Sequence, residues 1–389
     1  MFRLYVILTA GCLSHAMSTA VSGDHNRTQG RTSSIARPGL QSAGGAGKAP
    51  QPPGKPGKRP IPADEKAEAK ALKQLPAGFR IKHTRHYSVL YNTSKEAVAA
   101  FGAAIERTYR SCTKYTARRG LAVVRPKHKL LIYYFSGPRE YDEHARKIGA
   151  GKLSQSTPGI YFSGLNFGMF YDYRNRDKYK KARDSAEKKI KELSVRLRGA
   201  GSTEERKRLQ SQIRQAKARV NRTVVRAGEY NERIVQHEVA HQVLWNTGLH
   251  NRRKRSANPK WLREGIAMLF ETVSTGRSAN IGRVNQLRLG QYRKLEKEGK
   301  LSPLRDFIST PDLFKKKTLN DAYAQGWALT HYLNRAKRKG FEEYLKLIKL
   351  RPKAYRATPE REIEDFERIF GKLDQRWETR WKTWMAKVR

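Results

Sequence analysis

Residues 236–242, QHEVAHQ, place two histidines four positions apart, with a glutamate directly after the first. On a helix, residues at this spacing lie one above the other, so His237 and His241 can both reach one ion at about 2.0 to 2.1 Å. Glu238 is rotated by about 100° from His237 and flanks that ion, where it can accept a proton from water. The motif predicts half of a zinc site with Glu238 as general base. The alternative is an ordinary helix that contains two histidines.

A second motif, WLREGIAMLFE at residues 261–271, supplies the ligand that the first motif lacks. A catalytic zinc takes three protein ligands and keeps one position open for water. Glu264 follows on the next expected helix, which can lie against the first. We therefore expect one Zn²⁺ per chain, held by His237, His241 and Glu264.

Both motifs resemble those of the gluzincins, zinc peptidases with HExxH and a downstream glutamate, and in particular the peptidase-MA-like branch with its WLxEGxA motif. More narrowly, HEVAHQVLWNTGL, NPKWLREGIAMLFE and YAQGWALTHYL resemble the bacterial domain of unknown function 1570 family of exported proteins. The resemblance implies that His237, His241 and Glu264 are zinc ligands and that Glu238 is the base. Met268 stands where an acidic partner of a ligand histidine is expected, so Glu271 is the candidate for that role.

Tyr323 is a second candidate catalytic group, in the segment DAYAQGWALTHYL. By the resemblance, it falls where some gluzincins place a phenol that donates to a developing oxyanion. The alternative is a buried structural tyrosine. His331 can serve instead, although a lone histidine on a helix is more often structural. His250, beside a run of basic residues, is expected in an exposed loop.

The pattern of apolar residues predicts an α+β fold, with a small mixed sheet and a mainly helical, zincin-like catalytic domain over residues 79–389. Strands are expected at 86–92 and 129–135, with one or two more at 159–173. Thr93 and Glu96 predict the capped start of a helix over 94–112. Further helices are expected at 321–336, 341–350 and 365–388, the last with Trp377, Trp381 and Trp384 facing the core.

Residues 177–227 carry about three basic residues for each acidic one and predict an inserted antiparallel helical hairpin. One apolar seam comprises Ala186, Ile190, Leu193 and Leu197, and the other comprises Leu209, Ile213, Ala216 and Val220. The motif helix is expected to begin after Gly228. The basic outer faces indicate either a contact with a polyanion or only a solvated surface.

The first 20 residues, with Arg3, an apolar run and a Ser-Thr-Ala ending, predict a signal peptide and an exported bacterial protein. The apolar run is too short to span a bilayer, so we expect no transmembrane span. LTAGC resembles a lipobox, which makes Cys12 a possible lipid anchor. Residues 21–78, rich in Pro, Gly and Lys, predict a disordered basic linker.

A formal charge of +46 predicts attraction to polyanions such as anionic wall polymer. The leading hypothesis is an exported zinc metallopeptidase that acts on a peptide or protein substrate, whose backbone pairs with a strand near GIYFSG. The alternative is a polyanion-binding envelope protein with a structural or vestigial zinc site. Intracellular nucleic-acid binding conflicts with the export signal and lacks a recognised nucleic-acid module.

Overall fold

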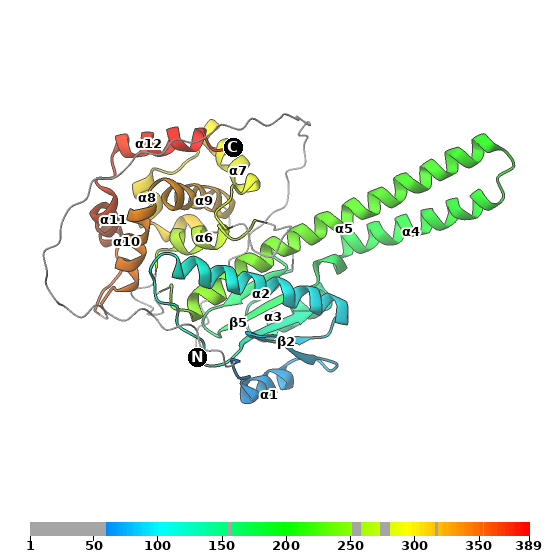
Figure 1. Ribbon diagram of the computed structural model, residues 1–389, viewed down its shortest axis with the longest axis horizontal. Helices are drawn as coiled ribbons and strands as arrows, with labels where there is room; N and C mark the ends of the chain where they lie inside the picture. The colour runs from blue at the N-terminus through cyan, green and yellow to red at the C-terminus, as the bar shows by residue number, and fades with distance from the viewer. Residues whose placement is uncertain (1–59, 155–156, 251–257, 273–280, 316–317, 353) are drawn as a thin grey trace, which may run out of the picture. The chain divides into compact units, whose positions relative to one another are not determined.

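The computed structural model describes residues 60–154, 157–250, 258–272, 281–315, 318–352 and 354–389 (Figure 1). All of these residues belong to one compact unit. A small mixed sheet and a larger set of helices form this unit, so the predicted α+β class is confirmed. The predicted signal peptide at 1–20, Cys12 and the predicted linker as far as residue 59 lie outside the described residues.

The sheet of the described chain has the strand order β1-β2-β3-β5-β4. Its strands are β1 (Arg80–His83), β2 (Tyr87–Tyr91), β3 (Leu130–Phe135), β4 (Gly159–Phe162) and β5 (Phe167–Tyr171). The central strands β2, β3 and β5 are parallel, and the outer strands β1 and β4 are antiparallel to their neighbours. Parallel neighbours need long crossovers, which contain α2 (Lys95–Ala117) and α3 (Pro138–Lys147). β4 pairs only with β5, so it is an outer strand of the sheet.

Alternate side chains of the strands point to opposite faces of the sheet, as the two-residue period requires. Val89 and Ile132 pack in the core that α2 and the motif helix share. Leu90 and Tyr133 pack on the other face in a second core. Both faces are covered, and the motif helix contacts β4 and β5.

Helix α1 (Glu65–Gln74) lies inside the segment predicted as linker, so the predicted linker end at residue 78 is wrong. Asp64 caps this helix through its side chain, and Ala71 and Leu75 are buried in the second core. The Pro/Gly-rich composition ends before Asp64, and apolar residues at helical spacing then give the chain a face to bury. The start of α2 also differs, because Ser94 and not Thr93 is its cap.

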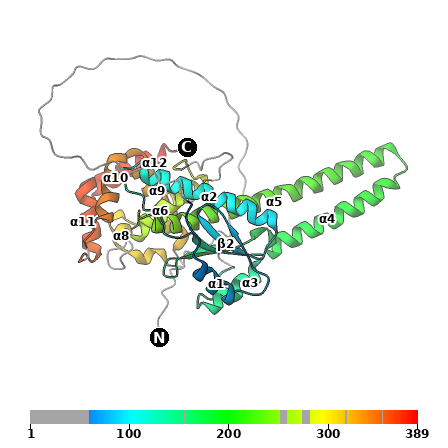
Figure 2. The same ribbon diagram turned by 60° about the horizontal axis from the view of Figure 1, so that its bottom comes forward.

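Helices α4 (Asp177–Arg198) and α5 (Thr203–Asn246) lie side by side and extend away from the sheet in both views (Figures 1 and 2). Near the tip, Leu193 packs with Leu209 and Ile213, so this part of the predicted seams is present. The expected separate motif helix is wrong, because α5 is one helix of 44 residues that runs through Gly228 to Asn246. Gly228 does not adopt the positive φ that would end a helix.

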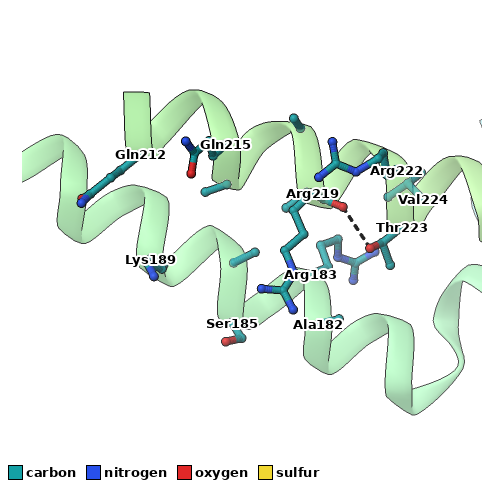
Figure 3. Close-up of a pocket in the computed structure, with 14 residues that line it drawn as sticks. Ala182, Arg183, Ser185, Lys189, Gln212, Gln215, Arg219, Arg222, Thr223 and Val224 are labelled. Atoms are coloured by element: carbon teal, nitrogen blue, oxygen red, sulfur yellow. Dashed lines mark hydrogen bonds between the residues drawn. The ribbon is translucent and has the colours of Figure 1, made fainter. Parts of the chain in front are cut away.

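Nearer the sheet, the two hairpin helices leave a gap of about 800 Å³ between them, shown in Figure 3. Ala186, Ala216 and Val220, predicted as seam residues, line this gap together with basic side chains such as Arg183 and Arg219. Ala186 and Ala216 offer little apolar surface to bury, so these positions give the two helices little reason to pack closely here. The predicted seams are therefore closed at the tip and open toward the base.

The C-terminal part of the unit is helical and packs around α9. Its helices are α6 (Lys260–Met268), α7 (Gln286–Lys297), α8 (Leu304–Ser309), α9 (Leu319–Ala336), α10 (Arg338–Lys349), α11 (Pro359–Phe370) and α12 (Gln375–Ala386). The expected single helix at 365–388 is wrong, because Gly371 adopts a φ of 80° and separates α11 from α12. Trp377 and Trp381 are buried and Trp384 is partly buried against the core, as predicted. Within the described ranges, no helix combines the length and apolarity needed to cross a bilayer.

Candidate metal centre

His237 and His241 lie on the buried part of α5, and Glu264 on α6 brings its carboxylate up to both rings. The two Nε2 atoms are 3.1 Å apart, and Glu264 Oε2 is 3.3 Å from each of them. A zinc ion with bonds of about 2.0 to 2.1 Å in tetrahedral geometry would separate its ligand atoms by about 3.3 to 3.4 Å. The three side chains therefore fit one metal ion of this size.

The short distance between α6 and α9 explains the glycine that follows Glu264. A Cβ on Gly265 would lie 1.9 Å from Thr330 Oγ1 and 3.0 Å from the Gly326 carbonyl oxygen. Only a residue without a side chain lets α6 approach α9 this closely. Gly265 thus helps to hold Glu264 at its place beside α5.

Glu271 fixes the orientation of His237, as the sequence suggested. Its Oε1 accepts a hydrogen bond of 2.8 Å from His237 Nδ1, which leaves Nε2 turned toward His241 and Glu264. The same carboxylate accepts bonds from Asn285 and Arg288 of the α7 segment. A ligand histidine with its second nitrogen bound to a carboxylate is typical of metal centres. Asn285 and Arg288 were not found from the sequence, which has no motif around them.

The electrostatics of the group favour a positive charge between the three side chains. Burial alone would lower the pKa of His237, but hydrogen bonds to Glu264 and Glu271 outweigh it and raise that pKa to about 10. Burial lowers the pKa of His241 below 6.5. Burial opposes the charge of Glu264, yet His241 and His237 hold its pKa well below 4.5. A cation is thus stabilised at the point where the ligand atoms meet.

Glu238 is buried beside this group, and its Oε2 accepts a 2.9 Å hydrogen bond from the Tyr161 amide N–H of β4. That amide points away from β5 toward α5, because it donates to Glu238. The bond holds the carboxylate between the outer strand of the sheet and the motif helix. Glu238 is thus close to the ligand group without belonging to it.

Tyr323 of α9 also lies beside the centre, with its ring centroid 6.1 Å from that of His237. Its hydroxyl is buried and has no hydrogen-bond partner among the described residues. Burial, reinforced by Glu264 and Glu238, raises the pKa of Tyr323 well above 10. The phenol keeps its proton at neutral pH and can act as a donor. His331 stacks on Trp327 in the core, with 5.0 Å between ring centroids, in keeping with a structural role.

His250 is buried, so the expectation of an exposed loop is wrong. Gly248, with a φ of 82°, ends α5 and turns the chain back, so that the His250 amide bonds the Leu244 carbonyl oxygen of the helix. A small pocket lies there, lined by Tyr161, Ser163, His241, Trp245, His250, Arg263 and Glu264. Burial lowers the pKa of His250 well below 6.5, so the ring is neutral at neutral pH. The basic residues at 251–257 lie outside the described residues.

The fold and the site define an α+β protein with a buried His-His-Glu group suited to one metal ion. Residues 232–353 match the family described as "Protein of unknown function (DUF1570)". The match contains all three members of the ligand group together with Glu238 and Tyr323, and it supports a relationship with that family. No curated protein matches the chain.

Proposed function

We propose that the protein is a zinc metallopeptidase whose single zinc ion is held by His237, His241 and Glu264. The observation that supports this most is the convergence of three buried ligand atoms at distances that suit tetrahedral zinc. When bound, zinc would polarise a carbonyl group and lower the pKa of water at the open position.

The surrounding residues have the chemistry that peptide hydrolysis needs. Glu238 takes the proton of the attacking water and passes it to the leaving amine. The Tyr323 hydroxyl, protonated and without a partner among the described residues, donates a hydrogen bond to the oxygen that gains negative charge. Glu271 and Arg288 hold His237 in one orientation and one tautomer.

The outer edge of β4 is the proposed binding site for substrate backbone. β4 pairs with β5 on one side only, and the Tyr161 amide on its other side reaches Glu238. The Gly159 amide and carbonyl oxygen already bond Thr157 Oγ1, and the Tyr161 amide bonds Glu238. A peptide that adds to this edge would therefore pair with the end of β4 past the Tyr161 amide, next to the proposed base. Such binding does not require particular side chains.

The decisive experiment replaces the proposed base and keeps the metal. Glu238→Gln preserves size and can still accept from the Tyr161 amide through its carbonyl oxygen. We expect one zinc per chain, measured by elemental analysis, and cleavage of a peptide library reduced by about 10²- to 10⁴-fold.

The matched control is Glu232→Gln, one helical turn and a half earlier on α5, where the side chain is partly exposed and pairs with Arg107. This variant should retain its cleavage rate. Equal rates in wild type and Glu238→Gln, or no zinc bound by wild type after reconstitution, would refute the proposal.

A second candidate function rests on the hairpin. The α4 and α5 segments of the hairpin carry an excess of exposed basic side chains, and the gap between them is lined by arginine and lysine side chains. We propose that, in an exported bacterial protein, this surface binds an anionic polymer of the cell envelope.

A further inference from the structure

The pocket beside the candidate metal centre is small and is built from four parts of the chain. Tyr161 of β4 and Ser163 just after it, His241 and Trp245 of α5, His250 of the turn after α5, and Arg263 and Glu264 of α6 line it. Its volume is about 30 Å³. About 10 to 15 Å³ of such volume holds one water molecule, so the pocket has room for a group with two oxygen-sized atoms.

Arg263 brings a positive charge to this pocket. In the part of the chain that the structure describes, its buried Nε has no hydrogen-bond partner and no carboxylate forms an ion pair with its guanidinium. Glu264 is the neighbouring carboxylate, but its Oε2 faces His237 and His241. A shielded cation without an anionic partner is unfavourable, and an anion in the pocket would remove that cost.

His250 supplies a second donor on another wall of the pocket. The side chain is 3% exposed, and its Nδ1 lies 3.2 Å from the Asn258 amide nitrogen. An amide nitrogen only donates, so Nδ1 accepts and the ring proton sits on Nε2. Nε2 is buried and has no hydrogen-bond partner among the described residues. Among the described residues, His250 Nε2 therefore lacks an acceptor, as Arg263 Nε does.

We propose that this pocket binds a carboxylate group of the substrate, with Arg263 and His250 as the donors. The planar guanidinium matches a carboxylate, and the volume suits two oxygens. Because the pocket shares His241 and Glu264 with the centre, the carboxylate belongs to a residue next to the scissile bond. This inference rests on the proposed peptidase function and names its substrate class, peptides with a carboxylate adjacent to the cleaved bond.

The carboxylate has two possible sources, the C-terminus of a peptide or the side chain of Asp or Glu. Three small probes separate them: N-acetylalanine, N-acetylaspartate α-amide and N-acetylalaninamide. Binding to the full-length protein is measured by tryptophan fluorescence, since Trp245 lines the pocket, and by calorimetry. Each titration is done with zinc-loaded and with chelator-treated protein.

We expect at least one of the two carboxylate probes to bind at least tenfold more tightly than N-acetylalaninamide. Arg263→Gln should weaken that binding by about tenfold to a hundredfold, the usual range for a lost charge-assisted hydrogen bond. His250→Gln should weaken it less, and Arg263→Lys should retain part of it. The control is Arg368→Gln on the exposed side of α11, which changes the net charge equally and should have no effect.

Zinc content and thermal unfolding of Arg263→Gln show whether the variant still folds around the centre. Equal affinity for all three probes, or carboxylate binding that survives in Arg263→Gln and is lost with zinc, overturns the inference. If the protein neither holds zinc nor cleaves peptides, the proposed function fails. The anion pocket is still tested in that case, because Arg263 and His250 line it with or without zinc, and the Arg263→Gln variant, treated with the same chelator, controls for Glu264 and His241.

Discussion

Glu271 links the proposed ligand His237 to a buried cation that lies on another helix. Its carboxylate accepts from His237 Nδ1 at 2.8 Å and from Arg288 at 3.0 and 3.1 Å. Burial would raise the pKa of Glu271, but Arg288 and His237 outweigh burial and lower it to about 2. The carboxylate is therefore charged across the physiological range and holds both partners.

Glu271→Gln should weaken zinc binding by about 10- to 100-fold, as is usual when the partner of a ligand histidine is lost. Glutamine can still accept from His237, but it removes the charge that balances Arg288. Chelator competition measures the affinity, and thermal unfolding shows whether the fold persists. Glu298→Gln, at the exposed end of α7, is the control. An unchanged zinc affinity would show that Glu271 is not a positioning residue.

Zinc binding should release about one proton per ion at pH 6. In the metal-free protein, the pKa of His237 is raised to about 10, so its ring is protonated, whereas the pKa of His241 is lowered. Zinc must displace the proton on His237 Nε2, so its affinity falls as the pH falls below about 10. Calorimetry in buffers of different ionisation enthalpy counts the protons. A release of zero would mean that His237 is already neutral.

At the residue scale, motif spacing identified the residues that the structure brings together. The four-residue step on a helix places His237 and His241 on one face whatever the rest of the fold. Arg263 and His250 were missed as pocket residues, because their surroundings depend on how α6 and the end of α5 meet β4. A basic neighbourhood in the sequence suggested exposure for His250, but the turn at Gly248 buries it.

At the scale of elements, the contact between α6 and α9 sets the position of Glu264, and Gly265→Ala tests it. The added Cβ would lie 1.9 Å from Thr330 Oγ1, so α6 must move away from α9. We expect a loss of about 1 to 3 kcal/mol in the free energy of unfolding, typical of overpacking. Zinc affinity should fall as well, since Glu264 is the next residue.

The matched control is Gly290→Ala on α7, where an added Cβ meets no atom within 4 Å. Alanine is favoured over glycine in a helix by up to about 1 kcal/mol, so this variant should be slightly more stable. Chemical denaturation measures both variants. If Gly265→Ala is as stable as Gly290→Ala and binds zinc normally, close packing of α6 on α9 is not what holds Glu264.

The elements themselves were largely predictable, and their ends were not. Strong apolar patterns gave β2, β3 and α2, because local periodicity determines them. The continuity of α5 through Gly228 was not predictable from the sequence. A glycine in a helix costs only about 1 kcal/mol, and packing outweighs that cost. Ala227, its neighbour, is buried in the second core and anchors the helix there.

At the scale of the whole molecule, α5 joins the basic hairpin directly to the candidate centre. The tip of the hairpin has its own small core, with Leu193, Leu209 and Ile213. Other contacts hold its base. The Tyr173 ring meets the Tyr179 ring edge-on at 5.2 Å between centroids and the tilted Tyr230 ring at 4.6 Å. The projecting part can therefore be removed only if this aromatic base remains.

Replacing residues 182–222 with a short Gly/Ser linker should leave zinc content and cleavage of a small peptide nearly unchanged. The replaced segment contributes its apolar contacts to its own core, and Ala227 and the tyrosines of the base are kept. Elemental analysis, thermal unfolding and peptide cleavage measure this outcome. Loss of folding would show that the hairpin is part of the main core.

The same replacement should weaken binding to an anionic wall polymer, because it removes many of the basic side chains that give the chain its charge of +46. Wild-type binding should also fall steeply with salt, since exposed charges are screened over about 8 Å at physiological ionic strength. A full-length variant with Lys188, Lys189 and Lys191 changed to Gln keeps the hairpin and removes only charge, so it separates charge from shape. If polymer binding is the same in all three proteins, the basic surface of the hairpin is solvated and does not bind a polyanion.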